Sequence, residues 1–309
     1  MPGRFPTFVI LGAAKAGTTS LYHHLRQHPE IYMSPVKEPR FFAFEGGPPP
    51  FYAPTDVSWI LHGEVYDLAS YHRLFEGVTT EKAIGEASPI YLYWPPAAER
   101  IRHYAPRARL IVMLRHPAER SFSQYMHFRR DGAEPLECFE AALDAEPERI
   151  RNNWNPMYFY ATRSRYVPQL ERYFNLFPRD QIRIYLSEDL HRDPHAVLSD
   201  LHSFIGVDPS FRTDVSGRYN ESGLPRSRGM YMAFERAGQL VRDAAGLTPR
   251  TLRLMNSEFV ARLGSSIRAK MLTRVALPAP ARARMIEFCR EDVRALQDVL
   301  HRDLSSWLR

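Results

Sequence analysis

The sequence predicts a three-layer α/β fold in which a central, mainly parallel sheet is flanked by helices. Two observations carry this prediction. Short apolar runs, which are typical of buried strands, alternate along the chain with segments of helical spacing. Residues 110–114 are consecutive apolar residues without polar alternation, as in a strand that is covered on both faces within a parallel sheet. Additional helices are expected at the C-terminal end of the chain.

Each strand is predicted from a short apolar run that is bounded by turn residues. Phe8 begins the first such run, which ends at Gly12. A weaker candidate begins at Ala83 and leads towards Ser88 and Pro89. The expected strands are residues 8–11, 83–85, 110–114 and 182–186.

Each helix is predicted from apolar residues that recur every three to five positions. Leu21 and Leu25 share one face of the first helix, and Pro117 directly follows a strand, where proline favours the start of a helix. In the last helix the spacing runs from Met285 to Trp307. The expected helices are residues 18–27, 121–130, 194–205, 230–242 and 285–307, and helical spacing also spans residues 158–177. The polar stretches 43–56 and 213–229 are expected to be loops.

Composition narrows the class of protein. The chain has 309 residues, of which 44% are hydrophobic and 25% charged, and this excludes fibrous, collagen-like and wholly disordered proteins. The two cysteines have no metal-ligand spacing, and no apolar stretch approaches the roughly 20 residues of a membrane span. The N-terminus has no signal-peptide pattern. We therefore expect a cytoplasmic protein without a membrane span.

The charge balance indicates an anionic partner. The formal net charge is +6, and the chain has only four lysines among its 41 basic residues: Lys15, Lys37, Lys82 and Lys270. Codon bias accounts for most of the arginines, but a lysine in so arginine-rich a chain suggests a local role. The excess of positive charge is compatible with nucleic acid, a phosphorylated cofactor or an acidic surface, and charge alone does not choose among them.

A phosphate-binding turn follows the first predicted strand. Between Gly12 and Gly17 the glycine spacing matches that of a P-loop, but Lys15 lies inside the loop instead of after the second glycine. Backbone N–H groups at the start of the next helix point at an anion in such a turn, and the hydroxyls of Thr18 and Thr19 add donors. No acidic residue ends a nearby apolar strand as a magnesium ligand would. The turn therefore predicts a P-loop-like fold that binds an anion without metal.

Three other segments carry candidate site residues. The first runs from Leu114 to Ser123, and it places Arg115 at the carboxyl edge of the sheet, where open α/β folds bind ligands. Ser123 lies about two helical turns further along, so that both side chains face one anion. The second is the late basic segment Arg226-Ser227-Arg228-Gly229, whose arginines suit bidentate phosphate capture. The third is Ser34-Pro35-Val36-Lys37-Glu38-Pro39-Arg40-Phe41-Phe42.

Together these four segments resemble those of the sulfotransferases that use 3′-phosphoadenosine 5′-phosphosulfate (PAPS) and release 3′-phosphoadenosine 5′-phosphate (PAP). The segment around Lys37 and Glu38 is similar to the branch that includes the heparan sulfate sulfotransferases and many bacterial enzymes. The resemblance covers roughly residues 5–230. It implies one sulfotransferase domain over residues 1–309, with a core at about 5–230 and a helical C-terminal part at about 230–309. It also implies a bacterial transferase that uses PAPS and no metal.

The resemblance implies a role for each matching residue. Lys15 would stabilise the charge on the departing nucleotide, Glu38 would act as the general base on the acceptor hydroxyl, and Lys37 would help to place the acceptor or the sulfonate. Arg115 and Ser123 would hold the 3′-phosphate, and the segment Arg226-Ser227-Arg228-Gly229 would close over it. The 5′-phosphate would be cradled by Lys15, Ala16, Gly17, Thr18, Thr19 and Ser20.

Several alternatives stay open from the sequence. His116, beside Arg115, is a second candidate for the general base. A small-molecule P-loop kinase would need Mg·ATP and an acidic metal ligand, and the displaced Lys15 counts against it. A basic nucleic-acid-binding protein ranks last, because no segment resembles a recognition helix or a base-stacking platform, and we expect no nucleic acid partner. The acceptor is a glycan, glycolipid, phenol or other hydroxyl-bearing small molecule, and the C-terminal helices either cap the site or form a homodimer contact.

Overall fold

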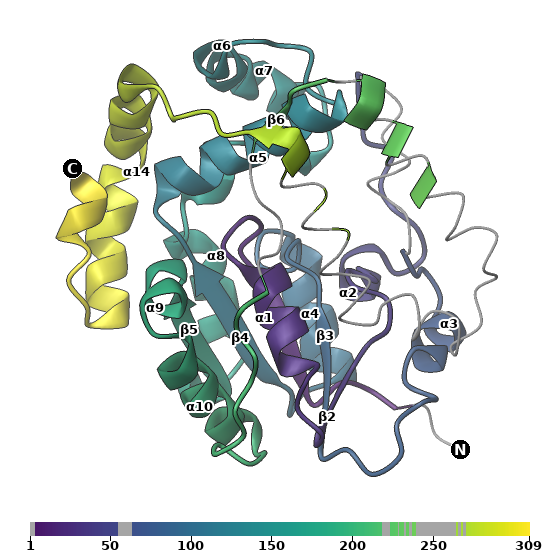
Figure 1. Cartoon of the computed structure of the whole chain (residues 1–309). Coiled ribbons are helices and arrows are strands. Elements are labelled where there is room, and N and C mark those ends of the chain that lie inside the picture. Colours follow the sequence, from purple (N-terminus) through teal and green to yellow (C-terminus); the bar gives the residue numbers. More distant parts are fainter. Residues whose placement is uncertain are drawn as a thin grey trace.

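The structure is a computed structural model, and it describes residues 4–54, 64–217, 223–227 and 270–309, together with positions 229–231, 233–234, 237–238, 264 and 267. Figure 1 shows the chain as a central sheet with helices packed around it. Arg228, most of the expected helix 230–242 and part of the expected loop 43–56 lie outside the described residues.

The central sheet has five parallel strands in the order β2-β3-β1-β4-β5. The three-layer α/β fold that the sequence predicts is therefore confirmed. All four predicted strands are present, and β2 is an additional strand of three residues, too short for a distinct apolar run. The strands are β1 (Phe8–Gly12), β2 (Ile31–Met33), β3 (Ala83–Ala87), β4 (Arg109–Leu114) and β5 (Ile182–Leu186).

The centre of the sheet is fully buried and closely packed. β1 pairs with both β3 and β4, and Phe8 lies opposite Gly85 on one side and Arg109 on the other. A Cβ atom at Gly85 would lie 2.1 Å from the Phe8 ring, so that only glycine fits at this position in β3. This close approach fixes the register of β3 against β1, and with it the position of the loop that follows β3.

Helices cover both faces of the sheet. In Figure 1, α1 lies in front of the strands and α4 behind them. The first half of the chain contributes α1 (Thr18–Leu25), α2 (Phe41–Phe44), α3 (Leu68–Arg73) and α4 (Pro95–Tyr104). The second half contributes α5 (Pro117–Asp131), α6 (Phe139–Asp144), α7 (Glu146–Arg151), α8 (Val167–Phe174), α9 (Ser187–Arg192), α10 (Pro194–Ile205) and α14 (Ala279–Leu300). Short 3₁₀ turns are η2 (Pro156–Tyr158), η3 (Thr162–Ser164), η4 (Arg179–Gln181) and η5 (Ser305–Leu308).

The helical spacing across residues 158–177 does not correspond to one helix. Only α8 is α-helical there, and η2 and η3 precede it. The reason lies in tertiary hydrogen bonds: the carboxylate of Glu146 accepts from the backbone N–H groups of Ala161 and Thr162, each at 2.7 Å. Those N–H groups are therefore committed to a side chain from another helix. The apolar positions in this stretch face the core without a regular helix.

Two other predicted helices can be compared with the structure at their ends. Helix α5 begins at Pro117, where the sequence favours a helix start, with the Nδ1 atom of His116 accepting from the Ala118 N–H at 3.2 Å. The last helix, α14, ends at Leu300, because His301 adopts a left-handed conformation with φ of 49°. The residues beyond it form η5, so that Trp307 packs from a 3₁₀ turn.

Part of the expected late loop is a short strand. β6 (Leu224–Pro225) pairs antiparallel with β7 (Leu272–Thr273), and the backbone N–H of Arg226 donates to the Met271 carbonyl at 2.9 Å. Near this pair, Figure 1 shows β6 beside α5. The late basic segment is thus tied at its start to the stretch that precedes α14.

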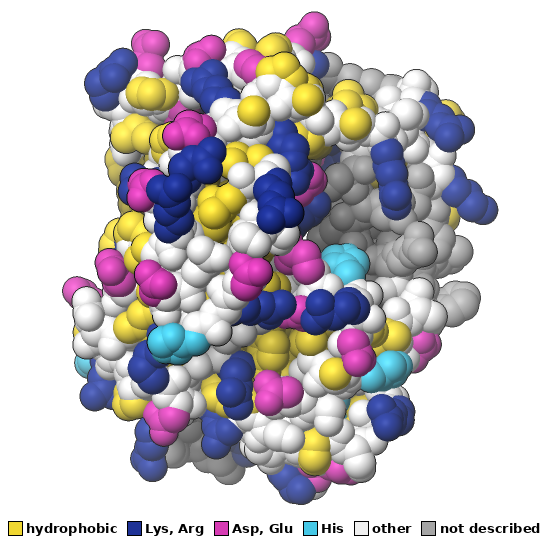
Figure 2. All heavy atoms as spheres, turned by 90° about the vertical axis from the view of Figure 1, so that its left-hand side faces the viewer, with side chains coloured by type: hydrophobic (Ala, Val, Ile, Leu, Met, Phe, Trp, Pro, Cys, Tyr) yellow, Lys and Arg dark blue, Asp and Glu magenta, His cyan; other side chains and the backbone are white. Residues whose placement is uncertain are grey.

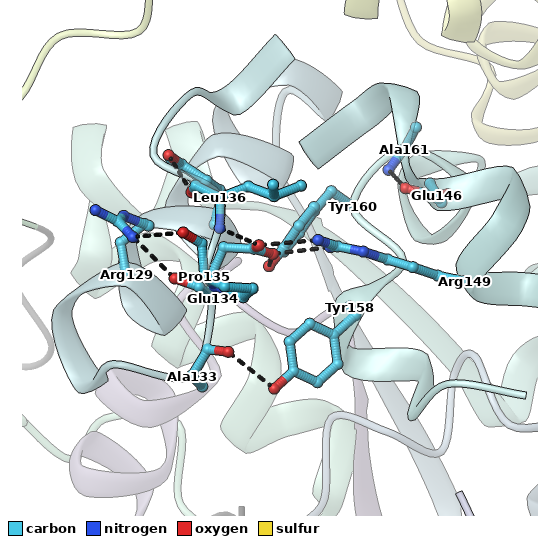
Figure 3. Close-up of polar contacts among 11 residues, drawn as sticks. Arg129, Ala133, Glu134, Pro135, Leu136, Glu146, Arg149, Tyr158, Tyr160 and Ala161 are labelled. Carbon is cyan, nitrogen blue, oxygen red and sulfur yellow. Dashed lines mark hydrogen bonds and ion pairs between the residues drawn. The ribbon is translucent and has the colours of Figure 1, made fainter. Parts of the chain in front are cut away.

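A buried polar cluster fixes the segment from residue 155 to 164. The side chains of Arg149 and Glu134 form two hydrogen bonds of 2.8 Å, and the Tyr160 hydroxyl donates to Glu134 at 2.7 Å. The Tyr158 hydroxyl donates to the Ala133 carbonyl. Figure 3 shows these contacts converging between α5 and α7. Breaking a buried pair of this kind leaves an uncompensated charge, which costs free energy. The cluster therefore holds the segment in one position.

Many of the described arginines form ion pairs, most of them at the surface. Figure 2 shows basic and acidic side chains interspersed over the face that carries α14. On that helix, Arg290 pairs with Glu287 and Arg294 with Glu291. Exposed pairs of this kind contribute little to stability. Among the residues that the structure describes, no helix is long and apolar enough to cross a membrane.

Candidate active site

A large cleft opens at the carboxyl edge of the sheet. It has a volume of about 1210 Å³, and the loops that follow β1, β2 and β4 all contribute to its walls. After β1 the chain forms β2 and β3 on one side of that strand and then crosses to β4 on the other side, so that the cleft lies at the topological switch point of the sheet. Residues 274–277, which lead into α14, close part of the opening.

The turn between β1 and α1 forms one wall of this cleft. Gly17 has φ of 98°, a left-handed conformation that glycine adopts without strain, and no side chain caps the N-terminus of α1. Lys15, Gly17, Thr18, Thr19 and Ser20 all line the cleft, whereas Ala16 is buried beneath it. The N-terminus of α1 and these hydroxyl-bearing residues thus line the cleft together, at the turn where the sequence predicts anion binding.

The ammonium group of Lys15 is poised to respond to an anion. Burial and the nearby Arg130 cation lower the pKa of Lys15 to about 7, although Asp131 and Glu38 oppose the shift. A nearby anionic ligand would raise this pKa again, because it stabilises the charged form. At neutral pH Lys15 is therefore only about half protonated without a ligand, and an anion in the cleft would raise the charged fraction.

Arg115 and Ser123 lie on a second wall, formed by the end of β4 and by α5. The Nη1 atom of Arg115 donates to the Lys15 carbonyl at 3.2 Å, and its Nη2 atom lies 3.7 Å from Glu119. Ser123 lines the same cleft from α5. The structure thus brings this predicted pair to the turn that carries Lys15, because parallel strands β1 and β4 end side by side.

Glu38 lies between two cations on the loop after β2. Its carboxylate accepts from the Lys37 ammonium at 2.5 Å and from Arg40 at 3.0 Å. Burial alone would raise the pKa of Glu38, but the two cations outweigh it and lower the pKa to about 2. Arg40 also binds Glu64 at 2.8 Å. Glu38 is therefore fully ionised at neutral pH, and it lines the cleft together with Lys37.

A buried carboxyl on β3 supports this loop. Glu86 accepts from the hydroxyls of Tyr71, Tyr91 and Ser88, each at 2.9 Å, and burial nevertheless raises the pKa of Glu86 to about 7. The Ser88 hydroxyl in turn accepts the backbone N–H of Arg40 at 3.1 Å. Because each hydroxyl proton is directed at Glu86, the Ser88 lone pairs are free to hold the loop that carries Glu38.

His116 occupies a structural position. Its Nδ1 atom caps α5, and its Nε2 atom lies 3.2 Å from the Nη2 atom of Arg282. Burial and the Arg282 cation lower the pKa of His116 to about 4. Both ring nitrogens are thus engaged with neighbouring groups, which favours Glu38 over His116 as the candidate base.

The late basic segment is not brought into the cleft wall by its described residues. Arg226, Ser227 and Gly229 are exposed and are not among the residues that line the cleft, although the neighbouring Gly223 is. Arg228 lies outside the described residues. The predicted role of this segment stays a prediction.

The cleft also contains cations that the sequence did not single out. Arg282 on α14 binds Glu119 at 2.6 Å and lines the cleft together with Arg274. Nothing in the sequence distinguishes either residue from the other arginines of the C-terminal part. Arg40, the partner of Glu38, lies in the segment of residues 34–42, which the sequence did single out. No role was predicted for Arg40 itself.

Comparison with known proteins identifies similar chains. The family model described as "Sulfotransferase family" matches residues 6–212. The membrane-associated sulfotransferase kil1 of Dictyostelium discoideum is 26% identical over 280 residues, which cover 65% of this chain and 56% of that protein. The human bifunctional heparan sulfate N-deacetylase/N-sulfotransferase 3 is 27% identical over 226 residues, which cover 67% of this chain and 23% of that protein. The chain thus spans about a quarter to just over half of the length of these two relatives.

One solved structure is similar over nearly the whole chain. A sulfotransferase from Alicyclobacillus acidocaldarius is 33% identical, with a TM-score of 0.76, and the match covers 99% of this chain and 100% of that chain.

The ion pairs of Glu38 predict a specific loss of stability in acid. The pKa of Glu38 is about 2 in the folded protein against an ordinary 4.5, so the unfolded chain binds more protons as the pH falls through this range. We expect the unfolding free energy of the wild type to fall relative to that of Glu38→Gln between pH 4.5 and pH 2, as measured by urea denaturation. Glu137→Gln is the control for loss of one carboxylate, because the Glu137 side chain is 88% exposed. A constant difference between wild type and Glu38→Gln across this range would contradict the assignment.

Proposed function

The chain belongs to the sulfotransferase family, and from this premise we propose that it transfers a sulfonate group from PAPS to an acceptor hydroxyl without a metal ion. One observation carries the proposal: Lys15 and Glu38 lie close enough to influence each other electrostatically, on two walls of one cleft. A cation for the leaving group and a carboxylate for the incoming hydroxyl are the two groups that such a transfer needs.

The cleft suits a nucleotide that bears phosphate at two positions. The N-terminus of α1, with Thr18 and Thr19, would hold the 5′-phosphate, and Arg115 with Ser123 would hold the 3′-phosphate. These two groups of donors lie on adjacent walls of the cleft, and the hydrogen bond from Arg115 to the Lys15 carbonyl joins the two walls. In this proposal the late basic segment with Arg226 and Arg228 closes over the 3′-phosphate.

The reaction is an in-line displacement at sulfur. As the acceptor oxygen forms its bond to sulfur, Glu38 accepts the hydroxyl proton. The bond from sulfur to the bridging oxygen breaks, and that oxygen remains on the 5′-phosphate of PAP. Lys15 donates a hydrogen bond to it and stabilises the developing charge. Positioning and electrostatics supply most of the rate, as they do for phosphoryl transfer.

The ion pairs of Glu38 suggest how its basicity is controlled. A carboxylate with a pKa of about 2 is a weak base at neutral pH. Lys37 is bonded to it at 2.5 Å and also lines the cleft. If Lys37 turns to the sulfonate when the donor binds, one of the two cations leaves Glu38, and the pKa of Glu38 rises. The arrangement thus couples donor binding to activation of the base.

The other parts of the proposal come from the family. We propose one sulfotransferase domain over residues 1–309 in a bacterial cytoplasmic enzyme, with α14 and Arg282 capping the cleft in preference to a homodimer contact. The acceptor class extends to glycans, glycolipids, phenols and other hydroxyl-bearing small molecules. The relative kil1 is a membrane-associated protein by its name, and the human relative acts on heparan sulfate.

PAP binding tests the nucleotide site. Isothermal calorimetry should show binding of PAP that is unchanged by EDTA, and Lys15→Ala and Arg115→Ala should each weaken it about 10- to 100-fold, because each removes a charge-assisted hydrogen bond. Arg294→Ala is the matched control, since Arg294 pairs with Glu291 on the exposed face of α14. The proposal would be refuted if the Lys15 and Arg115 variants bound PAP as tightly as the wild type does, or if the protein bound Mg·ATP in place of PAP.

Turnover tests the base. Glu38→Gln should bind PAP as the wild type does and lose about 100-fold or more in kcat, because the amide does not accept the hydroxyl proton. The measurement is transfer of ³⁵S from labelled PAPS to an acceptor that is found by screening hydroxyl compounds. Unchanged turnover would assign the role to His116, or to the substrate itself, and His116→Gln distinguishes these two.

A further inference from the structure

A small recess opens from the cleft beside Glu38. It has a volume of about 20 Å³, which is room for roughly one water-sized group. Its mouth is shared with the cleft, since Glu38, Arg40 and Met157 line both. Ala14 and Pro89 also line both, and the remaining walls are formed by Phe44, Ile90, Asn155, Pro156 and Arg163.

Arg163 contributes a cation to this recess that no carboxylate neutralises. Its side chain lies in η3 and the residue is only 4% exposed. The Nη1 atom is buried without a hydrogen-bond partner, and among the described residues no ion pair includes Arg163. Its one aromatic neighbour is Tyr93, whose ring centre lies 5.4 Å from the guanidinium carbon. A buried charge without a partner is costly, so its retention indicates a ligand that supplies the missing acceptor.

The charges around the recess show what is missing. Arg40 and Lys37 are balanced by Glu38 and Glu64, with which they form one continuous set of ion pairs. Arg163 adds a positive charge to this neutral set. A single negative charge in the recess would therefore balance it.

Arg163 also keeps its charge and its position. Burial and the Arg120 cation lower the pKa of Arg163 to about 9, which leaves the guanidinium protonated at neutral pH. The segment that carries it is held by the cluster of Glu134 and Arg149, and by Glu146, which binds the backbone at Ala161 (Figure 3). The guanidinium is thus prepared for an anion instead of being free to turn into solvent.

The position of Arg163 separates it from the nucleotide. Lys15 lines the cleft but not the recess, and Arg163 lines the recess but not the cleft. Glu38 lines both spaces, so the candidate base is shared by the cleft that holds Lys15 and the recess that holds Arg163. A group bound at Arg163 would therefore lie beside the candidate base, in a recess that Lys15 does not line.

We propose that Arg163 binds a carboxylate of the acceptor, and that the acceptor is therefore a hydroxy acid whose carboxylate enters the recess while its hydroxyl lies at Glu38. This inference rests on the proposed function for the identity of the ligand as acceptor. A recess of this size admits one oxygen atom beside the Arg163 guanidinium, and a carboxylate oxygen brings with it the single negative charge that the set lacks. A neutral acceptor would leave Arg163 unpaired.

Formate, the smallest carboxylate, tests the recess directly. Thermal unfolding of the full chain is followed at increasing formate concentration, against chloride at the same ionic strength, with and without saturating PAP. We expect formate to raise the wild-type midpoint by on the order of 2 °C when it is about tenfold above its dissociation constant. Arg163→Met should lose this response and Arg163→Lys should retain part of it. Arg165→Met, an exposed neighbour two residues away, should respond as the wild type does.

Two results in the wild type would overturn the proposal: no rise of the unfolding midpoint with formate, or an equal rise with chloride. A third is a rise in Arg163→Met as large as that of the wild type. Should Arg163→Met not fold, an undiminished rise in Arg163→Lys would overturn it instead. The titration without PAP does not depend on nucleotide binding, so a failure of the proposed function is seen separately as absent PAP binding. With an acceptor in hand, Arg163→Met should raise KM for the acid at least tenfold over that of its amide analogue, at unchanged PAP affinity, and an unchanged KM would contradict the role.

Discussion

The parallel pairing of β1 with both β3 and β4 is the constraint on which the rest of the site depends. Parallel strands end at the same edge, so this pairing brings the turn with Lys15 beside the residue that follows β4, Arg115, and beside the loop held by β3. The backbone N–H of Glu38 donates to the carbonyl of Ala87 at the end of β3, which ties the candidate base to the same edge. Gly85 permits the close contact with Phe8 that sets this register, and a side chain there would displace the whole wall.

Electrostatics then divides the cleft into two parts with different properties. Around Lys15 the charge depends on the ligand, because a pKa of about 7 leaves part of the side chain as a neutral amine that gains a proton when an anion arrives. Around Glu38 the charges are fixed in a closed set of ion pairs, to which Arg163 adds one unbalanced cation. The first part suits a group that leaves with negative charge, and the second suits a substrate that must be held while its hydroxyl loses a proton. In each part the charged side chains are already in position before any ligand binds, and this lowers the free energy of reorganisation during the reaction.

The sequence was sufficient where function depends on local chain geometry. The turn around Lys15, the strand before Arg115 and the sheet class follow from short-range patterns, and the structure confirms the fold. Arg163 and Arg282 were out of reach, because Arg163 is distinguished by its burial and Arg282 by its ion pair with Glu119, and both depend on segments distant in the chain. The helical spacing across 158–177 corresponds to a helix only in α8 for a similar reason: Glu146 takes backbone N–H groups that a longer helix would have used. Tertiary hydrogen bonds of this kind leave no periodic signal.

A crystal structure of the chain with PAP tests the central claim most directly. The account predicts the 5′-phosphate at the N-terminus of α1, within hydrogen-bond reach of Lys15 and Thr18. It predicts the 3′-phosphate at Arg115 and Ser123, with the space beside Glu38 left open for the acceptor. A nucleotide bound elsewhere, or one whose 5′-phosphate lies away from Lys15, would contradict the assignment of the cleft and with it the proposed transfer.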